Sequence, residues 1–282
     1  MSNITPQLIK ELRGRTGVGM GKCKVALEEA GGDIEKAIEN LRKAGMASAV
    51  KKEGREANEG LIGIGESDSA ISLVEVNSET DFVAQNEKFK QFLKDIAAEA
   101  AELKSDDLDA FMKEKCKHDT SITIDEYRAL IVQSLGENIQ VKRLHVIPKS
   151  ADISIGVYSH MGGKIVTAVV LTGGAGNEAL ARDVAMHIAA EAPEYLSPED
   201  VPEKIKERER EIGRSQVQNK PENIIEKILE GKLKAYFDQF CLLNQKYIKD
   251  NSMSITELLA KESKEAGKTL AVQSFLRWQI GD

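Results

Sequence analysis

Hydrophobic residues recur at helical spacing through the first ~50 positions of the chain. Thr5 followed by Pro6 predicts a helix start, because threonine caps helix N-termini and proline fits the first helical position. Breaks at the glycine-rich stretch 16–23 and at Gly31–Gly32 separate three apolar stripes, and Asp33 is placed to cap the third helix. The stripes are Leu8, Ile9, Leu12; Cys23, Ala26, Leu27, Ala30; and Ile34, Ala37, Ile38, Leu41. The pattern predicts a compact module of three short helices.

A β-hairpin followed by a helix is predicted twice further along the chain. The first copy has strands at 61–65 and 70–76, an elbow at 77–81 and a helix carrying Phe89, Phe92, Leu93 and Ile96. The second has strands at 153–158 and 164–171, an elbow at 172–177 and a helix containing "ARDVAMHIAAEA". Between the copies we expect helices at 108–116 and 124–135 and a strand at 139–147. Two such units predict an α+β core of two related subdomains.

The composition changes after Pro198. A highly charged segment with a thin apolar stripe precedes a second segment, after Pro221, whose apolar face is denser. We expect these two helices to form a protruding antiparallel helical hairpin with apolar surface left for self-association into a homodimer. A helix over 254–265, capped at its start by Ser254, and a strand at 270–280 then return to the core. The predicted parts are a three-helix domain with linker helix (1–54), a first core subdomain (55–148), a second (149–197 and 246–282) and the hairpin insertion (198–245).

Charge and composition narrow the choice of partner and compartment. The 282 residues carry 39 Lys and Arg against 46 Asp and Glu, a formal charge of −7. This balance argues against a protein held to nucleic acid through phosphates. No apolar run approaches the about 18 residues of a membrane span, and the N-terminal stretch lacks the apolar region of a signal peptide. Three widely separated cysteines indicate a reducing compartment, so we expect a cytoplasmic protein without membrane contact.

The common enzyme signatures do not occur in the sequence. The four histidines never pair at metal-ligand spacing, and the cysteines form no Cys-x-x-Cys pair. Neither His-Glu-x-x-His nor Gly-x-Ser-x-Gly is present. We therefore expect no enzyme, no catalytic residues, no metal and no cofactor, although residues brought together only by folding lie beyond such a search.

Two glycine-rich stretches resemble nucleotide loops in part. "TGVGMGKC" (16–23) has Gly21–Lys22 but lacks the first glycine and the Ser or Thr of a phosphate loop, and a helix rather than a strand precedes it. "TGGAGNEA" (172–179) satisfies the Gly-x-Gly-x-x-Ala spacing of dinucleotide-binding folds after a strand, but no second parallel strand is predicted after the helix. Ordinary turns are the favoured interpretation, and a dinucleotide enzyme is a weaker alternative.

Four stretches resemble the elongation factor Ts family of bacterial translation factors. They are "LRGRTGVGMGKCKVAL" (12–27), "EVNSETDFVAQN" (75–86), "GENIQVKR" (136–143) and "YSHMGGKI" (158–165). Their order and spacing match the family over nearly the whole chain, and the three-helix module resembles ubiquitin-associated (UBA) domains. The resemblance implies a guanine-nucleotide exchange factor that binds elongation factor Tu with GDP and promotes GDP release so that GTP can rebind. Many members continue past the last strand into another helix, and contacts made by that helix are in doubt for this sequence.

The resemblance also assigns residues to this interaction. Thr80, Asp81, Phe82 and Val83 would enter the partner near its Mg²⁺, with Phe82 as the wedge and Asp81 as a polar contact. From local physics alone, Thr80 or Asp81 would cap the following helix and Phe82 would staple it. Further partner contacts are expected at Met20 and Gly21.

A last contact is expected at His160, which could equally be a solvated turn histidine. A second hypothesis for the whole chain is a UBA-like adaptor that dimerises and has no exchange activity. It rests on the apolar face of the small three-helix module, which can serve a partner as well as its own core.

Overall fold

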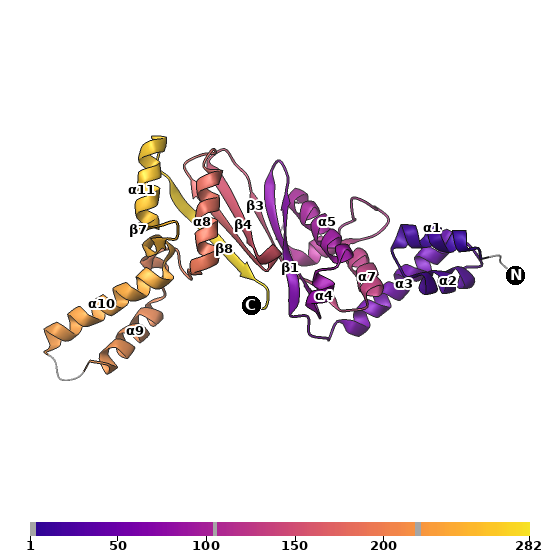
Figure 1. Ribbon diagram of the computed structural model, residues 1–282, viewed down its shortest axis with the longest axis horizontal. Helices are drawn as coiled ribbons and strands as arrows, with labels where there is room; N and C mark the ends of the chain where they lie inside the picture. The colour runs from indigo at the N-terminus through magenta and orange to yellow at the C-terminus, as the bar shows by residue number, and fades with distance from the viewer. Residues whose placement is uncertain (1–3, 104–105, 218–220) are drawn as a thin grey trace. The chain divides into compact units, whose positions relative to one another are not determined.

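The computed structural model describes residues 4–103, 106–217 and 221–282 and shows an α+β protein, as predicted (Figure 1). The chain divides into two compact units. Unit 1 comprises Met1–Lys149, Gly162–Lys164 and Gln279–Asp282, and unit 2 comprises Ser150–Met161 and Ile165–Trp278. The predicted division into four parts is finer than this and remains a prediction.

Unit 1 begins with the three predicted helices, α1 (Pro6–Thr16), α2 (Met20–Glu29) and α3 (Ile34–Lys52). The Thr5 hydroxyl accepts a hydrogen bond from the backbone N–H of Leu8 (3.2 Å), and Asp33 caps α3 in the same way. Gly17 ends α1 at φ 66°, a conformation that favours glycine. The stripes predicted from the sequence meet in a small core, so the sequence pattern determined this module.

A three-stranded antiparallel sheet follows, in the order β1 (Glu59–Glu66), β2 (Ala70–Ser78), β3 (Ile139–Pro148). Helix α5 (Glu87–Leu103) packs against β1 and β2. Strand β1 and helix α5 are in close contact at Gly65, where a Cβ would lie only 2.0 Å from the carbonyl oxygen of Ala97. Every residue of the central strand β2 is buried, which makes it a rigid support for the segment that follows it.

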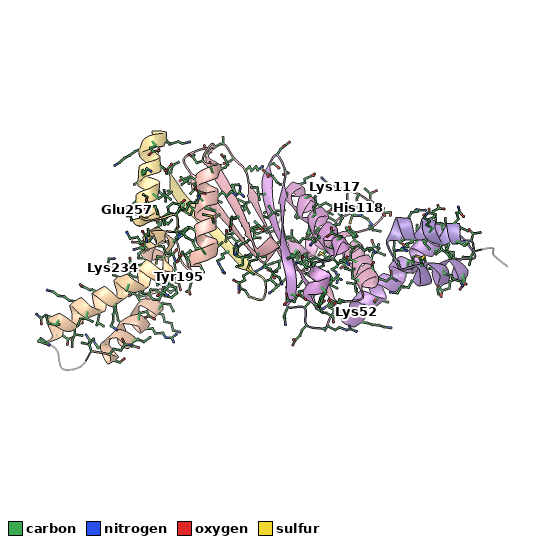
Figure 2. All side chains as sticks on the ribbon, in the orientation of Figure 1. Lys52, Lys117, His118, Tyr195, Lys234 and Glu257 are labelled. Atoms are coloured by element: carbon green, nitrogen blue, oxygen red, sulfur yellow. The ribbon has the colours of Figure 1, made fainter. Side chains whose placement is uncertain are left out.

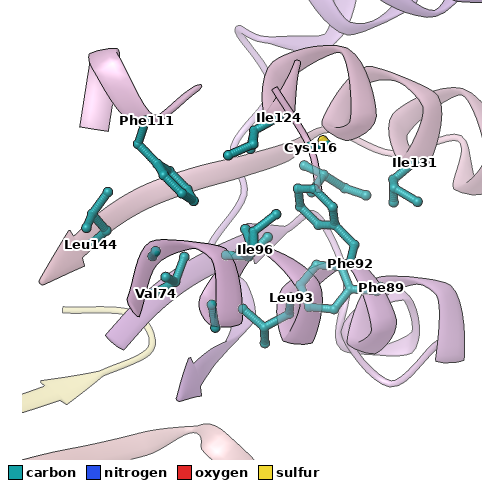
Figure 3. Close-up of a cluster of buried hydrophobic side chains, with 14 of the residues drawn as sticks. Val74, Phe89, Phe92, Leu93, Ile96, Phe111, Cys116, Ile124, Ile131 and Leu144 are labelled. Carbon is teal, nitrogen blue, oxygen red and sulfur yellow. The ribbon is translucent and has the colours of Figure 1, made fainter. Parts of the chain in front are cut away.

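Helices α6 (Leu108–Lys113) and α7 (Ile124–Leu135) complete unit 1. The prediction of a helix over 108–116 was too long, because the chain leaves α6 at Glu114 and pairs Lys115 with Thr123 in an isolated antiparallel bridge. This pairing brings Cys116 into the main core, as Figure 3 shows. There the aromatic rings of Phe89, Phe92 and Phe111 fill the space beside α5.

Unit 2 repeats the arrangement with a second sheet. Its strands are β4 (Ile153–His160), β5 (Ile165–Thr172) and β8 (Ala271–Gln279), with β5 in the centre. Helix α8 (Glu178–Glu191) packs on β4 and β5, and a Cβ on Gly156 would lie 2.1 Å from the backbone of α8. The first strand of each predicted copy therefore carries a glycine against which the helix backbone rests.

The predicted helical hairpin is formed by α9 (Glu203–Ser215) and α10 (Glu222–Phe240), which lie side by side in Figure 1. Gly213 permits the contact, since a Cβ there would lie 2.7 Å from Leu229 Cδ2. The chain continues through β6 (Lys246–Tyr247) and β7 (Asp250–Ser254), a small pair that the sequence pattern did not predict, to α11 (Ile255–Ala266). Ser254 caps α11 as expected. Short 3₁₀ turns lie at Met161–Gly163, Pro198–Asp200 and Leu242–Asn244.

Candidate functional site: the elbow after the second strand

The predicted contact tetrad lies in a tight elbow between β2 and α5. The chain leaves β2 at Ser78 and immediately forms the one-turn helix α4 (Asp81–Ala84). The Ser78 hydroxyl donates to the carbonyl oxygen of Thr80 (2.9 Å), and the backbone N–H of Val83 donates to the Thr80 hydroxyl (3.4 Å). Thr80, one of the two residues that the local interpretation proposed as the cap, therefore caps α4.

A residue from a distant part of the chain fixes the same elbow. Glu137 follows α7, where Gly136 ends the helix at φ 87°. Its carboxylate accepts two hydrogen bonds from Thr80, one from the backbone N–H (3.0 Å) and one from the hydroxyl (2.7 Å). Such paired, charge-assisted bonds orient both groups. The conformation of the elbow is thus held by tertiary contacts as well as by the local cap.

The neighbouring residues reinforce this clamp. The Glu79 carboxylate accepts a hydrogen bond from the backbone N–H of Asn138 (2.6 Å) and forms an ion pair with Arg55 (3.3 Å). The Asn138 side-chain amide donates to the carbonyl oxygen of Arg55 (2.8 Å). Residues 136–138 therefore tie the elbow to the end of the first module. Sequence reasoning noted this stretch in the family resemblance but did not assign Glu137 a role, because its partner is 57 positions away.

Phe82 is held by this frame with its ring in solvent. Its exposed fraction is 84%, the highest among the large exposed hydrophobic side chains of the described residues. The expectation that Phe82 would staple the helix was therefore wrong, because Val83 and Ala84 supply the contact with the core instead. Asp81 is exposed beside it. Thr80 and Val83 anchor the segment together with Ala84, whereas Asp81 and Phe82 face outward.

Met20 and Gly21 lie at the start of α2, also in unit 1. The Met20 side chain is 58% exposed. A Cβ on Gly21 would meet nothing within 4 Å, so the fold does not require glycine at this position. The next residue, Lys22, donates its ammonium to the carbonyl oxygen of Gln133 on α7 (2.9 Å), which fastens this end of α2 to the rest of the unit. Met20 and Gly21 are thus accessible at the start of a helix that is held to α7.

His160 belongs to unit 2 and ends β4. Its ring is exposed and stacks on Tyr158, with centroids 6.0 Å apart, and its Nδ1 lies 3.3 Å from the Tyr158 hydroxyl. Met161, the next residue, is 69% exposed and adopts φ 49°, which is uncommon for a residue other than glycine. Sequence reasoning did not select Met161. The turn at the end of β4 therefore presents an apolar side chain, Met161, next to a polar one, His160.

The two glycine-rich stretches do not form nucleotide loops. Residues 17–19 connect helix α1 to helix α2, so no strand leads into the loop as phosphate binding requires. After β5, the Glu178 side chain accepts a hydrogen bond from the backbone N–H of Gly176 (3.0 Å), and this bond holds the pKa of Glu178 below its usual value. The chain's own carboxylate therefore occupies the donor that a phosphate would use. Strands β4 and β5 are antiparallel, unlike those of a dinucleotide-binding fold.

Comparison with known proteins finds relatives that match the whole chain. The family model for elongation factor Ts matches residues 79–282. The elongation factor Ts of Protochlamydia amoebophila is 59% identical, and that of Chlamydia muridarum is 44% identical. Each alignment spans 281 residues and covers 100% of both chains.

The matches identify the class of protein first, a translation elongation factor. More narrowly, the chain belongs to the elongation factor Ts family. Among the described residues, none of the helices combines the length and apolar character needed to span a membrane.

Proposed function

We propose that the chain is a guanine-nucleotide exchange factor for elongation factor Tu. It binds the GTPase with GDP, disturbs the Mg²⁺ and phosphate site through the elbow, and promotes release of GDP so that GTP can rebind. The observation that carries this proposal is Phe82, a large apolar side chain left 84% exposed on an elbow that Glu137 and the Thr80 cap hold in one conformation. An aromatic side chain presented on a fixed segment is the kind of group that serves as an interface anchor, so its burial is expected in a complex.

The exchange requires no bond-making by this chain. If the factor weakens GDP binding to the GTPase, GDP weakens binding of the factor by the same ratio, because the coupling free energy is reciprocal. A coupling of about 3 kcal/mol changes the affinity for nucleotide by roughly 150-fold. A pre-organised elbow serves this purpose, since its backbone is already ordered before the complex forms. Asp81 would place a negative charge beside the partner's Mg²⁺ and phosphate groups.

The test is release of labelled GDP from the cognate elongation factor Tu under catalytic amounts of this protein. We expect Phe82→Ala to slow stimulated release by roughly tenfold or more, as loss of a buried aromatic anchor costs about 2 kcal/mol. Ile64→Ala, which removes another exposed apolar side chain of unit 1, serves as the control and leaves the rate unchanged. An unaltered rate in Phe82→Ala would remove the wedge role from this residue.

A UBA-like adaptor is the second candidate, and one observation favours it. A groove of about 470 Å³ runs beside α2 and α3, and its lining includes Val25, Leu41 and Ala44. Val25 is half exposed there, as expected of a surface that receives an apolar side chain. If the native protein failed to stimulate GDP release at all while Val25→Asp abolished binding of another protein, this candidate would replace the first. Stimulated release by the native protein excludes it as the whole function.

A further inference from the structure

A carboxylate, a thiol and an imidazole meet in unit 1 at a place that plays no part in the elbow. Glu99 lies on α5, and Cys116 and His118 lie on the segment between α6 and α7. One potential ligand atom of each residue lies within 4.8 Å of the other two. The His118 Nδ1 is 3.9 Å from the Glu99 carboxylate. The sequence search for metal ligands missed this group because Glu99 and Cys116 are 17 positions apart.

Backbone hydrogen bonds and ring contacts position the three side chains near one another. The N–H of Cys116 donates to the carbonyl oxygen of Ile122 (3.0 Å), and the N–H of Lys117 donates to Glu99 Oε1 (2.9 Å). The ring of Tyr127 lies against that of His118, with centroids 4.6 Å apart. Tyr127 is itself fixed by donating its hydroxyl to Asp95 (3.0 Å). The group is therefore organised by several independent contacts rather than by chance proximity on a surface.

Burial makes this combination of groups unusual. Glu99 is 6% exposed and Cys116 is fully buried, whereas His118 is half exposed and provides an opening to solvent. Lys117, which separates the two segment ligands, turns outward to pair with Glu102 and places no cation in the group. Figure 2 shows Lys117 and His118 next to each other beside α5. A buried carboxylate normally requires a compensating charge, and a divalent cation would supply it.

We propose that Glu99, Cys116 and His118 form a binding site for Zn²⁺, with water as the fourth ligand. A carboxylate, a thiolate and a neutral imidazole are all zinc ligands, and two negative charges balance the ion, which suits a buried position. Zinc bonds of about 2.0–2.3 Å require the ligand atoms to approach each other to roughly 3–4 Å, a small closure that the half-exposed His118 ring can make. The Cys116 thiol loses its proton to solvent as the zinc–sulfur bond forms. The ion would tie the segment 114–123 to α5.

The site can be tested on the full chain with Zn²⁺, and with Co²⁺ as a spectroscopic substitute. We expect one equivalent of zinc to bind, and Co²⁺ to give a thiolate-to-metal charge-transfer band. Cys116→Ser should lose the band. His118→Gln should weaken zinc binding by roughly tenfold or more. Even removal of a residue that only hydrogen-bonds to a metal ligand has an effect of about this size, and loss of the ligand itself should not have a smaller one.

Two matched controls leave the site intact. Cys241→Ser removes another buried cysteine, and His145→Gln removes a histidine that also faces a carboxylate, Asp106, at 2.8 Å. Both should bind zinc as the native chain does. Because Cys116 is in the core and its variant can unfold, the His118→Gln result decides the question alone if necessary. Absence of zinc binding by the native chain, or undiminished binding by His118→Gln, would show that the three residues are only packed together and would overturn the proposal.

Discussion

Glu137 illustrates how one side chain can control a site that it does not occupy. It contributes no surface to the proposed contact, yet its two hydrogen bonds to Thr80 keep the elbow in place. Because the carboxylate accepts from both the backbone N–H and the hydroxyl, it opposes any rotation of the turn that carries Phe82. The hydrogen bonds to Glu137 therefore position the segment that exposes the Phe82 ring.

Replacement of Glu137 tests this positioning role. We expect Glu137→Ala to reduce stimulated GDP release less than Phe82→Ala does, by roughly three- to tenfold, because a typical hydrogen bond contributes about 0.5–1.5 kcal/mol net and the Thr80 cap remains. Thr80→Ser, which keeps the hydroxyl, should retain activity. Glu66→Ala removes a carboxylate from a surface ion pair of the same unit and provides the control. Equal rates for Glu137→Ala and the native protein would show that the local cap alone positions Phe82.

His187 supports a second prediction at the scale of single residues. It is fully buried in unit 2, where its Nδ1 accepts a hydrogen bond from the N–H of Ile248 (3.2 Å). Its Nε2 therefore carries the proton and donates to Gln245 Oε1 (3.0 Å), since Gln245 uses its amide nitrogen to donate to carbonyl oxygens. Burial lowers the pKa of His187, an effect that Gln245 and Glu191 oppose. The neutral ring satisfies every partner, and a second proton would displace the bond from Ile248.

Stability of the protein should consequently depend on pH below neutrality. Because the pKa of His187 is lower in the folded state, the unfolded state binds more protons in this range, and stability rises with pH. The contribution is complete above the ordinary value of about 6.5 and is lost as the pH falls toward the pKa of the folded protein. Urea unfolding at a series of pH values measures this slope. His187→Gln should flatten it, whereas His145→Gln, at a partly exposed histidine, should not. Identical slopes in all three proteins would exclude the assignment.

At the scale of elements, the two hairpin-plus-helix units share a physical feature that their sequences only partly show. Gly65 on β1 and Gly156 on β4 each lie beneath the backbone of the following helix, at 2.0 and 2.1 Å from where a Cβ would be placed. The atoms in the way are backbone atoms of α5 and α8, which cannot rotate aside. The helix-to-sheet spacing in both units therefore depends on the missing side chain.

Alanine at either glycine should force the helix from its sheet. We expect Gly65→Ala and Gly156→Ala to lower the free energy of unfolding by about 1–3 kcal/mol or more, the cost of overpacking a core. Gly21→Ala is the matched control, because a Cβ there meets nothing and alanine favours a helix, so that variant should be as stable as the native chain or more so. Thermal or urea unfolding distinguishes the three. Native stability in Gly156→Ala would mean that α8 can shift without loss of packing.

At the scale of the whole molecule, the helical hairpin of α9 and α10 buries few of its own side chains. Leu229 and Gly213 form its buried contact, and Arg214 links the two helices by ion pairs to Glu222 and Glu226. Ile212 and Ile224 remain exposed. These two side chains leave apolar surface on a segment that is otherwise strongly charged.

We predict that this surface supports a homodimer. Ile224→Asp should shift the protein toward monomer in sedimentation equilibrium, because a charge placed in an apolar contact must be desolvated. Glu230→Lys is the control, because it replaces one exposed charged residue of α10 by another. This variant should associate as the native protein does. A native chain that sediments as a monomer at every concentration tested would contradict the prediction.

Sequence periodicity was sufficient for the elements whose stabilisation is local. Thr5, Asp33 and Ser254 cap the helices that they were expected to cap, and the three apolar stripes of the first module meet in its core. The limits of α6 and the small β6–β7 pair could not be obtained this way. They depend on backbone pairing between separate segments, such as Lys115 with Thr123, which leaves no regular hydrophobic pattern.

By itself the sequence determined the α+β organisation, the two related units and the family, since each depends on residues close together or on matching stretches. Only the tertiary structure decided that Phe82 is exposed rather than stapled, that Glu137 clamps the elbow, and that Glu99 joins Cys116 and His118. The physical reason is the same in each case. Exposure and long-range hydrogen bonding depend on which segments the folded chain brings together, and hydrophobic periodicity carries no information about contacts between distant residues.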